Sequence, residues 1–362
     1  LSRQALSELP PEVDAGESLE IEDSLEGVWQ WNALLLDRGW GDGLPAAPPT
    51  AERVGWLLSG VDRPPDEIVG VVPPRRGIAT VEKLAVNAAM AGCRPEQLPV
   101  LLAALEAMLD EDFNLAGIQT TTNPCGPLLI VNGPLAGQVG LNAGFGALGP
   151  GSQANACLGR AVRLCLLNIG GGRVGREDRA TQGQPGKYSF CFAENEAESP
   201  WEPLHVERGF RPEDSTVTVV GAEGPQNIND HAHQDAHGIL TVAAKAMGSA
   251  AGNHFAFTRG QPLLVLAPYH ARRVAAGGLD KVDVKRFLHE QARAPLAQVK
   301  LGGMWGLGAW PAWYPTSDDA ASVPLTEDWQ DMMVAVAGGS GKHSCWVPTF
   351  GMTRAVTRRV SM

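Results

Sequence analysis

A run of nine residues, 229–237, contains three of the eight histidines and two aspartates. Imidazole and carboxylate groups bind zinc, iron, nickel and manganese in proteins. If the segment is extended, His231 and His233 point to the same face, because side chains alternate along a strand. If a helix starts near Asp235, His233 and His237 form an i, i+4 pair. Either geometry supplies two ligands, so we expect His231, His233 and His237 to bind a divalent transition metal (Zn, Fe, Ni or Mn).

The same run also has a purely structural explanation. Asp230 or Asp235 could cap the helix that follows, because an aspartate side chain accepts hydrogen bonds from the free backbone N–H groups at a helix start. The three histidines would then lie in a solvated turn with no ligand. Both explanations stay open at the level of the sequence.

A second cluster of reactive side chains lies in the segment 186–205. Alternation of aromatic and smaller residues from Lys187 to Ala193 predicts a strand with Lys187 and Cys191 on one face. Glu194 follows the end of this strand, where catalytic carboxylates often lie in α/β proteins. Lysine and glutamate beside Cys191 would suit a thiolate nucleophile. We expect Glu194 and His205 to take part in catalysis, and a solvated acidic loop is the alternative.

Cys125 is a further candidate nucleophile. It lies in a predicted turn between Pro124 and Pro127, and Gly126 would let a substrate approach the backbone. Asn123 is a candidate substrate contact beside it. Since no histidine or acid is close in sequence, an inert thiol in a structural turn is the favoured alternative. The six cysteines are scattered without a CxxC pair, which predicts no disulfide framework and a reducing, cytoplasmic location.

Several residues could bind an anionic part of a substrate. The segment 144–149 matches GxGxxG formally, but the preceding predicted strand ends too early and no acidic residue follows at the usual distance. We therefore expect no nucleotide cofactor. Backbone N–H groups from Gly149 to Gln153, at the start of a predicted helix, could still hold an anion. Arg75 and Arg76, together with Lys187, could serve the same group.

One more histidine follows a predicted strand. His270 comes just after the apolar segment 262–267. Strand ends in α/β folds point into ligand crevices, so His270 could complete a catalytic site with His231. A capping or surface role is the alternative.

Composition limits the class of protein. The 362 residues are 44% hydrophobic and 19% charged, and the net charge is -11. An acidic chain lacks the basic surface that nucleic acids and anionic membranes require. No stretch of 18 apolar residues and no signal-peptide pattern is visible. We expect a cytoplasmic homo-oligomer with a small-molecule substrate, with neither a nucleic-acid nor a membrane partner.

Periodic patterns predict alternating helices and strands. We expect helices over 51–58, 80–91, 94–109, 153–169 and 327–337, and strands over 67–72, 116–122, 128–131 and 262–267. This alternation predicts an α/β (or α+β) fold with mixed sheets flanked by helices. We expect an N-terminal arm with anchoring helices (1–60), a first α/β half (61–215) and a second half (216–362), which could form one continuous domain.

Two apolar segments are alike in sequence. Residues 127–134 (PLLIVNGP) and 262–268 (PLLVLAP) each follow a helix rich in alanine and methionine. This likeness predicts an internal duplication of a helix–strand–helix unit. The alternative is that apolar strands flanked by proline resemble one another.

Three segments resemble a known group of proteins. Residues 41–50 (GDGLPAAPPT), 85–93 (AVNAAMAGC) and the block 186–205 are similar to stretches of an uncharacterised family of soluble bacterial proteins. Some members are encoded near small selenoprotein-type oxidoreductases with a Sec-Gly-Ser-Cys motif. The resemblance implies no particular activity or catalytic residue. It implies a bacterial, cytoplasmic protein of redox or sulfur metabolism.

These observations predict an enzyme. The first hypothesis is a hydrolase or lyase in which the histidine-bound metal activates water or a substrate carbonyl and Glu194 acts as general base. The second is a metal-free enzyme in which Cys125 or Cys191 attacks the substrate, assisted by His231 or His270. The third is a non-catalytic subunit of a larger complex, which would use the tryptophan-rich segment 301–315 as its interface.

Overall fold

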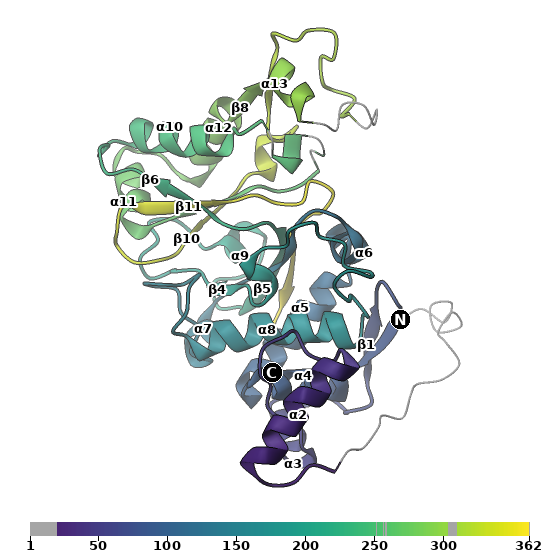
Figure 1. Ribbon diagram of the computed structural model, residues 1–362. Coiled ribbons are helices and arrows are strands. Elements are labelled where there is room, and N and C mark those ends of the chain that lie inside the picture. Colours follow the sequence, from purple (N-terminus) through teal and green to yellow (C-terminus); the bar gives the residue numbers. More distant parts are fainter. Residues whose placement is uncertain (1–19, 251, 256, 258, 303–309, 362) are drawn as a thin grey trace.

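The computed structural model describes residues 20–250, 252–255, 257, 259–302 and 310–361. Two four-stranded mixed sheets pack face to face, and helices lie against the outer side of each sheet (Figure 1). The molecule therefore has four layers, in the order helices, sheet, sheet, helices. This confirms the predicted α/β class with mixed sheets flanked by helices.

The first sheet has the strand order β12-β5-β3-β4. Its strands are β3 (Gly126–Asn132), β4 (Cys191–Ala193), β5 (Thr216–Ala222) and β12 (Val356–Arg359). Strands β3 and β4 are parallel, and the other two pairs are antiparallel. Its outer side packs against α5 (Leu98–Met108) and α8 (Gln153–Asn168), and α4 (Val81–Ala91) packs on these two helices.

The second sheet has the strand order β10-β7-β11-β6. Its strands are β6 (Gln226–Asn229), β7 (Leu263–Leu266), β10 (Met333–Val336) and β11 (His343–Val347). Strands β7 and β10 are parallel, and the other two pairs are antiparallel. Its outer side packs against α10 (Ala236–Met247), α11 (Pro268–Ala276) and α12 (Lys281–Gln291).

The layers follow from the period of two along each strand. Leu128 and Ile130 of β3 point into the core between the sheets, where they join Leu263 and Val265 of β7. The intervening residues of each strand point to the helices on the outside. Since both faces of the central strands are buried, these strands are continuous apolar runs and do not alternate with polar residues.

The two sheets are built alike. Strands β4, β3, β5 and β12 correspond in order and direction to β10, β7, β11 and β6. The equivalent β3 and β7 overlap the two sequence segments that resemble each other. This likeness supports the internal duplication, which stays a prediction. The fourth strands are exchanged: β6 follows β5 in the chain but joins the second sheet, and β12 follows β11 but joins the first. Where the two connections cross, Ala222 and Thr349 form an antiparallel bridge flanked by two backbone hydrogen bonds of 2.8 Å.

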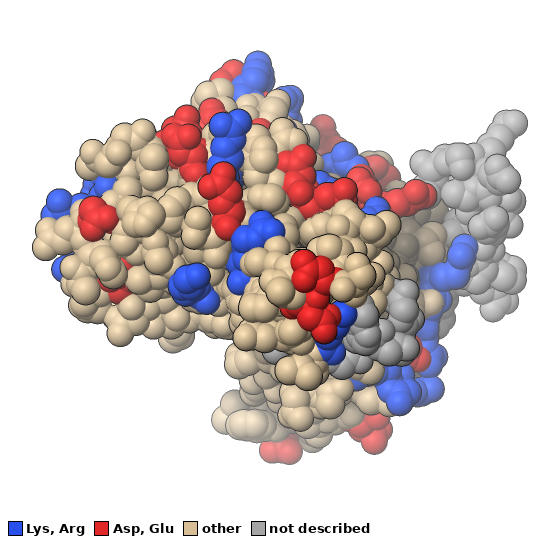
Figure 2. Space-filling model, turned by 90° about the horizontal axis from the view of Figure 1, so that it is seen from above, with Lys and Arg blue, Asp and Glu red and all other residues tan. Residues whose placement is uncertain are grey.

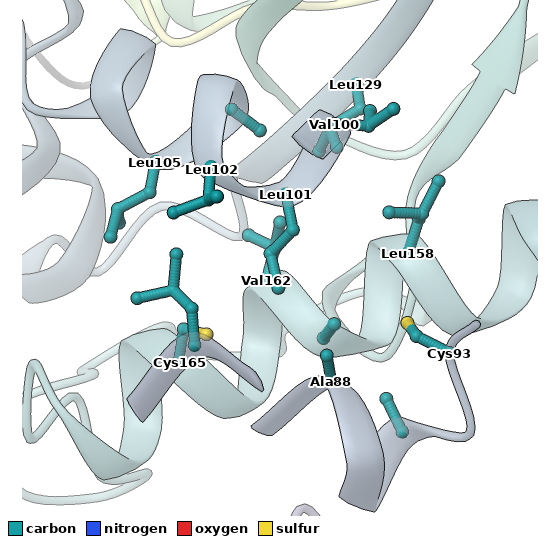
Figure 3. Close-up of a cluster of buried hydrophobic side chains, with 14 of the residues drawn as sticks. Ala88, Cys93, Val100, Leu101, Leu102, Leu105, Leu129, Leu158, Val162 and Cys165 are labelled. Carbon is teal, nitrogen blue, oxygen red and sulfur yellow. The ribbon is translucent and has the colours of Figure 1, made fainter. Parts of the chain in front are cut away.

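Threonine side chains cap two of the predicted helices. Thr80 accepts a hydrogen bond from the Lys83 N–H at the start of α4, and Thr50 caps α3 (Ala51–Leu58) in the same way. Gly92 ends α4 in the left-handed conformation that glycine adopts without strain. Side chains of α4, α5 and α8 meet in one buried cluster (Figure 3).

The other α-helices and strands lie outside these layers or at their ends. They are α2 (Leu25–Arg38), β1 (Ile68–Val72), β2 (Gly77–Thr80), α6 (Leu115–Thr120), α7 (Pro134–Gln138), α9 (Leu204–Glu207), β8 (Arg293–Pro295), α13 (Leu296–Leu301) and β9 (Ser322–Pro324). Two predictions of element type were wrong, because 116–122 is mostly the helix α6 and 327–337 contains the strand β10. The expected boundary at 215/216 lies before β5, which pairs within the first sheet.

Two predicted features lie partly outside the described residues. These are the N-terminal arm, of which 1–19 are not described, and the segment 301–315, of which 303–309 are not described. Within the part of the chain that the structure describes, no helix is both long and apolar enough to span a membrane.

Candidate functional site

The carboxyl ends of the parallel strands β3 and β4 bring polar side chains together. Asn132 is the last residue of β3, and Glu194 follows β4. Glu194 Oε2 accepts hydrogen bonds from Asn132 Nδ2 and from the Leu204 N–H, both at 2.7 Å, and Oε1 accepts one from the Val336 N–H at 3.3 Å. Glu194 therefore links β3, the start of α9 and β10, which belong to both halves of the molecule.

The environment of Glu194 changes its acidity. Its side chain has no exposed surface, and this burial raises the pKa of its carboxyl group, while the ammonium of Lys281, 4.0 Å away, opposes the rise. A carboxyl group with a raised pKa is typical of acid–base sites. In this conformation, however, the side chain has no contact with solvent. Its hydrogen bonds hold the neighbouring segments in place.

Next to Glu194 lie groups with unused hydrogen-bonding capacity. Glu196 Oε1 accepts from Asn132 Nδ2 at 2.9 Å and from the Gly133 N–H at 2.7 Å, and it lies 3.9 Å from His205 Nδ1. His205 is fully buried, yet neither ring nitrogen has a protein partner, and Asn132 Oδ1 also lacks one. Buried polar atoms of this kind normally bind ordered water or a ligand.

A cavity of about 310 Å³ lies beside this cluster, between the two halves. Its walls include Leu204 and Glu207 of α9, Lys285 of α12, and Arg208. Glu207 forms ion pairs with Lys285 and, at 3.3 Å, with Lys281, whose side chains are 9% and 6% exposed. The cavity is thus lined by ionised groups that are largely removed from water.

The charge around this cavity is positive. Two cations, Arg208 and Lys285, line the cavity beside one carboxylate, Glu207. Lys281 lies behind them, where its ammonium pairs with both Glu207 and Glu194. Arg208 is held by hydrogen bonds from Nε to Thr357 Oγ1 at 2.6 Å and from Nη2 to the Ala355 carbonyl at 2.7 Å. An excess of buried positive charge in a chain with a net charge of -11 favours an anionic ligand.

The predicted metal ligands do not come together. His231 Nε2 faces His343 Nε2 at 3.2 Å, His233 Nδ1 lies 3.0 Å from Asp230 Oδ1, and the His237 ring packs edge-on against Phe287. Within the described ranges, no group of three or more histidine, cysteine or acidic side chains could hold a metal ion.

Of the two aspartates that could cap the helix after the histidine run, Asp235 does so. The side chain of Asp235 accepts a hydrogen bond from the Gly238 N–H at 2.8 Å and caps α10. Asp230 instead accepts hydrogen bonds from the backbone of Ala232 and His233. Although burial opposes it, these bonds hold the pKa of Asp230 below its ordinary value. The segment is therefore an ordered turn before α10.

His270 is buried within the second half. Its Nε2 lies 3.1 Å from the Asp230 carbonyl oxygen, and its Nδ1 lies 2.8 Å from Ser344 Oγ. Since a carbonyl only accepts, Nε2 carries the proton and Nδ1 accepts from the Ser344 hydroxyl. Burial lowers the pKa of His270, and both its nitrogens are used in packing the turn onto the sheet.

The two candidate nucleophilic thiols are buried. Cys125 has no exposed surface, and Cys191 points to the helix side of the first sheet. Burial raises the pKa of each thiol to about 12. Since the thiolate is the nucleophile, this environment favours an inert role for both cysteines.

The polar residues around Cys125 are held in structural contacts. Asn123 accepts a hydrogen bond from the Cys125 N–H at 2.9 Å and donates one to Glu223 at 2.7 Å. The ammonium of Lys187 lies 2.9 Å from the buried carboxylate of Asp178. The predicted strand from Lys187 to Ala193 is shorter than expected, because only Cys191–Ala193 pairs with β3.

The predicted anion-binding residues are separated from one another. Gly149 lies in the loop before α8 and donates its N–H to the Gly146 carbonyl at 2.8 Å. A cavity of about 560 Å³ opens at this helix start. Arg75 lies at the other end of the 16-residue helix, where its N–H donates to the Gly170 carbonyl and its side chain pairs with Glu177. Arg76, which follows it, has a left-handed backbone with φ 59°.

Several residues of these sites were not predicted from the sequence, among them Glu207, Arg208 and Lys285 of the cavity. Asn132 ends an apolar strand, and a polar residue at that point is a signal that could have been used. Lys281 and His343 reach their partners only through tertiary packing, since Lys281 lies on α12 and His343 on β11. Nothing in their local sequence marks them.

The face of the molecule shown in Figure 2 carries acidic and basic side chains side by side, without a broad basic area. Comparisons of the chain with protein-family models, curated proteins and solved structures find no match. The resemblance to the bacterial family associated with Sec-Gly-Ser-Cys oxidoreductases and the expected homo-oligomer stay predictions.

Proposed function

We propose that the protein is a small-molecule enzyme of the hydrolase or lyase type that binds an anionic substrate in the cavity between its two halves. One observation carries this proposal. The cavity of about 310 Å³ is lined by ionised groups that are buried or half-buried, with one more cation than carboxylate. Holding two cations, Arg208 and Lys285, largely out of water beside one carboxylate is costly unless an anion completes the site.

The cavity residues have distinct roles in this proposal. Arg208 and Lys285 hold the anionic group of the substrate, because a desolvated guanidinium or ammonium forms strong charge-assisted hydrogen bonds. Glu207 transfers a proton from water or from the substrate carbon, which are the steps that begin hydrolysis and elimination. The Glu207–Lys285 ion pair keeps these two groups within reach of one another.

The buried cluster behind the cavity positions these residues. Glu194 accepts from the Leu204 N–H and so fixes the start of α9, which carries Glu207 and leads to Arg208. His205 belongs to the same short helix, and its Nδ1 lies 3.9 Å from Glu196 Oε1 in the buried cluster. We assign Glu194 a positioning role, in place of the general-base role that the sequence suggested.

The alternative mechanisms draw less support from the geometry. Neither Cys125 nor Cys191 lines this cavity, and the histidines 231, 233 and 237 do not line it either. A metal-activated or thiol-based reaction would therefore take place elsewhere in the molecule.

Binding of small anions tests the proposal. A panel of dicarboxylates, phosphomonoesters and sulfonates is titrated against the protein, and binding is followed by thermal shift and by ligand-observed NMR. Arg208→Gln and Lys285→Gln should each weaken the best binder by about 10- to 100-fold, since each removes a hydrogen bond between charged groups. Arg272→Gln, which alters an exposed ion pair with Glu198, should leave binding unchanged.

Turnover separates catalysis from binding. Compounds that bind are incubated with the protein, and hydrolysis or elimination products are followed by NMR. Glu207→Gln should retain binding and lose turnover by about 100-fold or more, as expected for loss of an acid–base group. Binding that persists in both cation variants would place the ligand elsewhere and refute the proposed site.

A further inference from the structure

A second site lies at the equivalent strand ends of the other half. His343 begins β11, and its counterpart in the first sheet is Thr216, the residue of β5 that pairs with Asn132. The equivalent strand order and register of the two sheets therefore place His343 where the first half has its polar cluster. Residues 230–235, which follow the exchanged strand β6, bring His231 to the same point. This second site does not depend on the function proposed above.

The two imidazoles face each other with the geometry of metal ligands. His231 Nε2 and His343 Nε2 lie 3.2 Å apart, with ring centroids 5.0 Å apart and the ring planes at 74°. In a tetrahedral zinc site with Zn–N bonds of about 2.0–2.1 Å, the two nitrogens are about 3.3–3.4 Å apart. Both side chains are exposed, so water can fill the remaining coordination positions.

The protonation of His343 suits a ligand. Its Nδ1 lies 3.1 Å from Asn227 Oδ1, which only accepts, so Nδ1 carries the proton and Nε2 presents its lone pair to His231. A hydrogen bond from the second ring nitrogen to a fixed acceptor is the usual support of a metal-bound histidine. In the metal-free pair, His231 Nε2–H donates to His343 Nε2. Moving that proton to His231 Nδ1 frees the second lone pair without a change in net charge.

We propose that His231 and His343 form an exchangeable binding site for a borderline divalent cation such as Zn²⁺, with water completing the coordination. Imidazole is a preferred ligand of this class of metal ions. The ligand set differs from the one predicted from the sequence, since His343 replaces His233 and His237. Lys342, whose ammonium lies 3.4 Å from the His231 carbonyl, adds a positive charge nearby that moderates the affinity.

Zn²⁺ titration tests this site. The full chain is freed of metal by dialysis against a chelator, and ZnCl₂ is titrated in a calorimeter at pH 7.5. We expect one ion per chain, and at least a tenfold weaker affinity in His231→Ala and in His343→Ala. Asn227→Ala should weaken binding by about tenfold, because loss of a supporting hydrogen bond typically costs 10- to 100-fold.

Matched variants separate this site from the predicted one. His233→Ala and His237→Ala should bind Zn²⁺ within about twofold of the parent, and circular dichroism should show that all variants keep their fold. Imidazole ¹⁵N shifts should report zinc on Nε2 of His231 and His343. Absence of stoichiometric binding in the parent would overturn the proposal and leave the pair as a simple hydrogen bond. Binding that survives in both His231→Ala and His343→Ala would overturn it as well.

Discussion

The replacement Glu194→Gln tests how the buried carboxyl group joins the two halves. Glutamine has the same shape and can place its oxygen where Oε2 lies, so it keeps the hydrogen bonds from Asn132 and Leu204. Its NH₂ group then meets the Val336 N–H and the Lys281 ammonium, which are both donors. The substitution therefore loses one hydrogen bond and the attraction of one ion pair.

The size of the effect follows from these contacts. Leaving the buried Val336 N–H without an acceptor costs about 1–3 kcal/mol of unfolding free energy. Glu194→Ala, which also leaves the donors of Asn132 and Leu204 unpaired, should cost more, roughly 3–5 kcal/mol. Glu213→Gln, at an exposed side chain, is the control and should change the unfolding free energy by less than about 0.5 kcal/mol.

The cost of Glu194→Gln should also depend on pH. Burial raises the pKa of Glu194, so the folded protein binds the proton more tightly than the unfolded chain, whose glutamates titrate near about 4.3. This contribution to stability is complete below the unfolded pKa and is lost as pH rises through the folded pKa. Glutamine does not titrate, so the parent's advantage over the variant should be largest near pH 4 and should shrink toward pH 7.

Urea unfolding of parent, variant and control, measured at several pH values between 4 and 7.5, gives the required free energies. A parent advantage that grows as pH rises would show that the folded protein prefers the ionised carboxylate. That result would refute the argument from burial and would make the Glu194–Lys281 attraction the dominant effect.

Three further predictions follow from the packing. In the native protein, Cys125 and Cys191 should react with a thiol reagent at least about a hundredfold more slowly than in urea, and fast native labelling in mass spectra would revive the thiol mechanism. Arg160→Gln removes a buried pair with Asp42, whose side chain is 2% exposed, and should cost about 3–5 kcal/mol in denaturant unfolding; a cost under about 1 kcal/mol would mean that the pair contributes little. Leu158→Ala, at a fully buried position of α8, should cost about 2–5 kcal/mol, and a smaller loss would show that the core around it refills.

Local signals in the sequence predicted several helices well. Helices α3 and α4 lie where they were predicted and are capped by Thr50 and Thr80, and α8 covers nearly the whole predicted range. In each case the cap and the apolar face lie within a few turns, so formation of the helix can be predicted from neighbouring residues alone. Glu194 was also expected at a strand end, and it lies there.

Other elements depend on contacts that the local sequence does not contain. Residues 116–122 are rich in threonine, which favours strands, but Asn114 caps the segment through the Gly117 N–H and Ile118 packs into the core. Met333–Val336 is apolar at every position because both faces of this parallel strand are covered, so its pattern does not distinguish strand from helix.

The histidine pair shows the same limit at the level of the site. His231 and His343 are 112 residues apart, and they meet because β6 pairs with β11 in a particular register. Sequence proximity favoured His231, His233 and His237 instead. The exchange of β6 and β12 determines which histidines face each other, and no local sequence pattern reveals this exchange.

The exchange of β6 and β12 has a consequence for synthesis on the ribosome. Strand β5 lies inside the first sheet only because β12 covers its outer edge, and β12 follows all the other described strands in the chain. While the second half is being translated, β5 therefore has a row of unpaired backbone N–H and C=O groups, which is a known route to misassociation between nascent chains. The first sheet is therefore complete only after β12, the last described strand, has been synthesised.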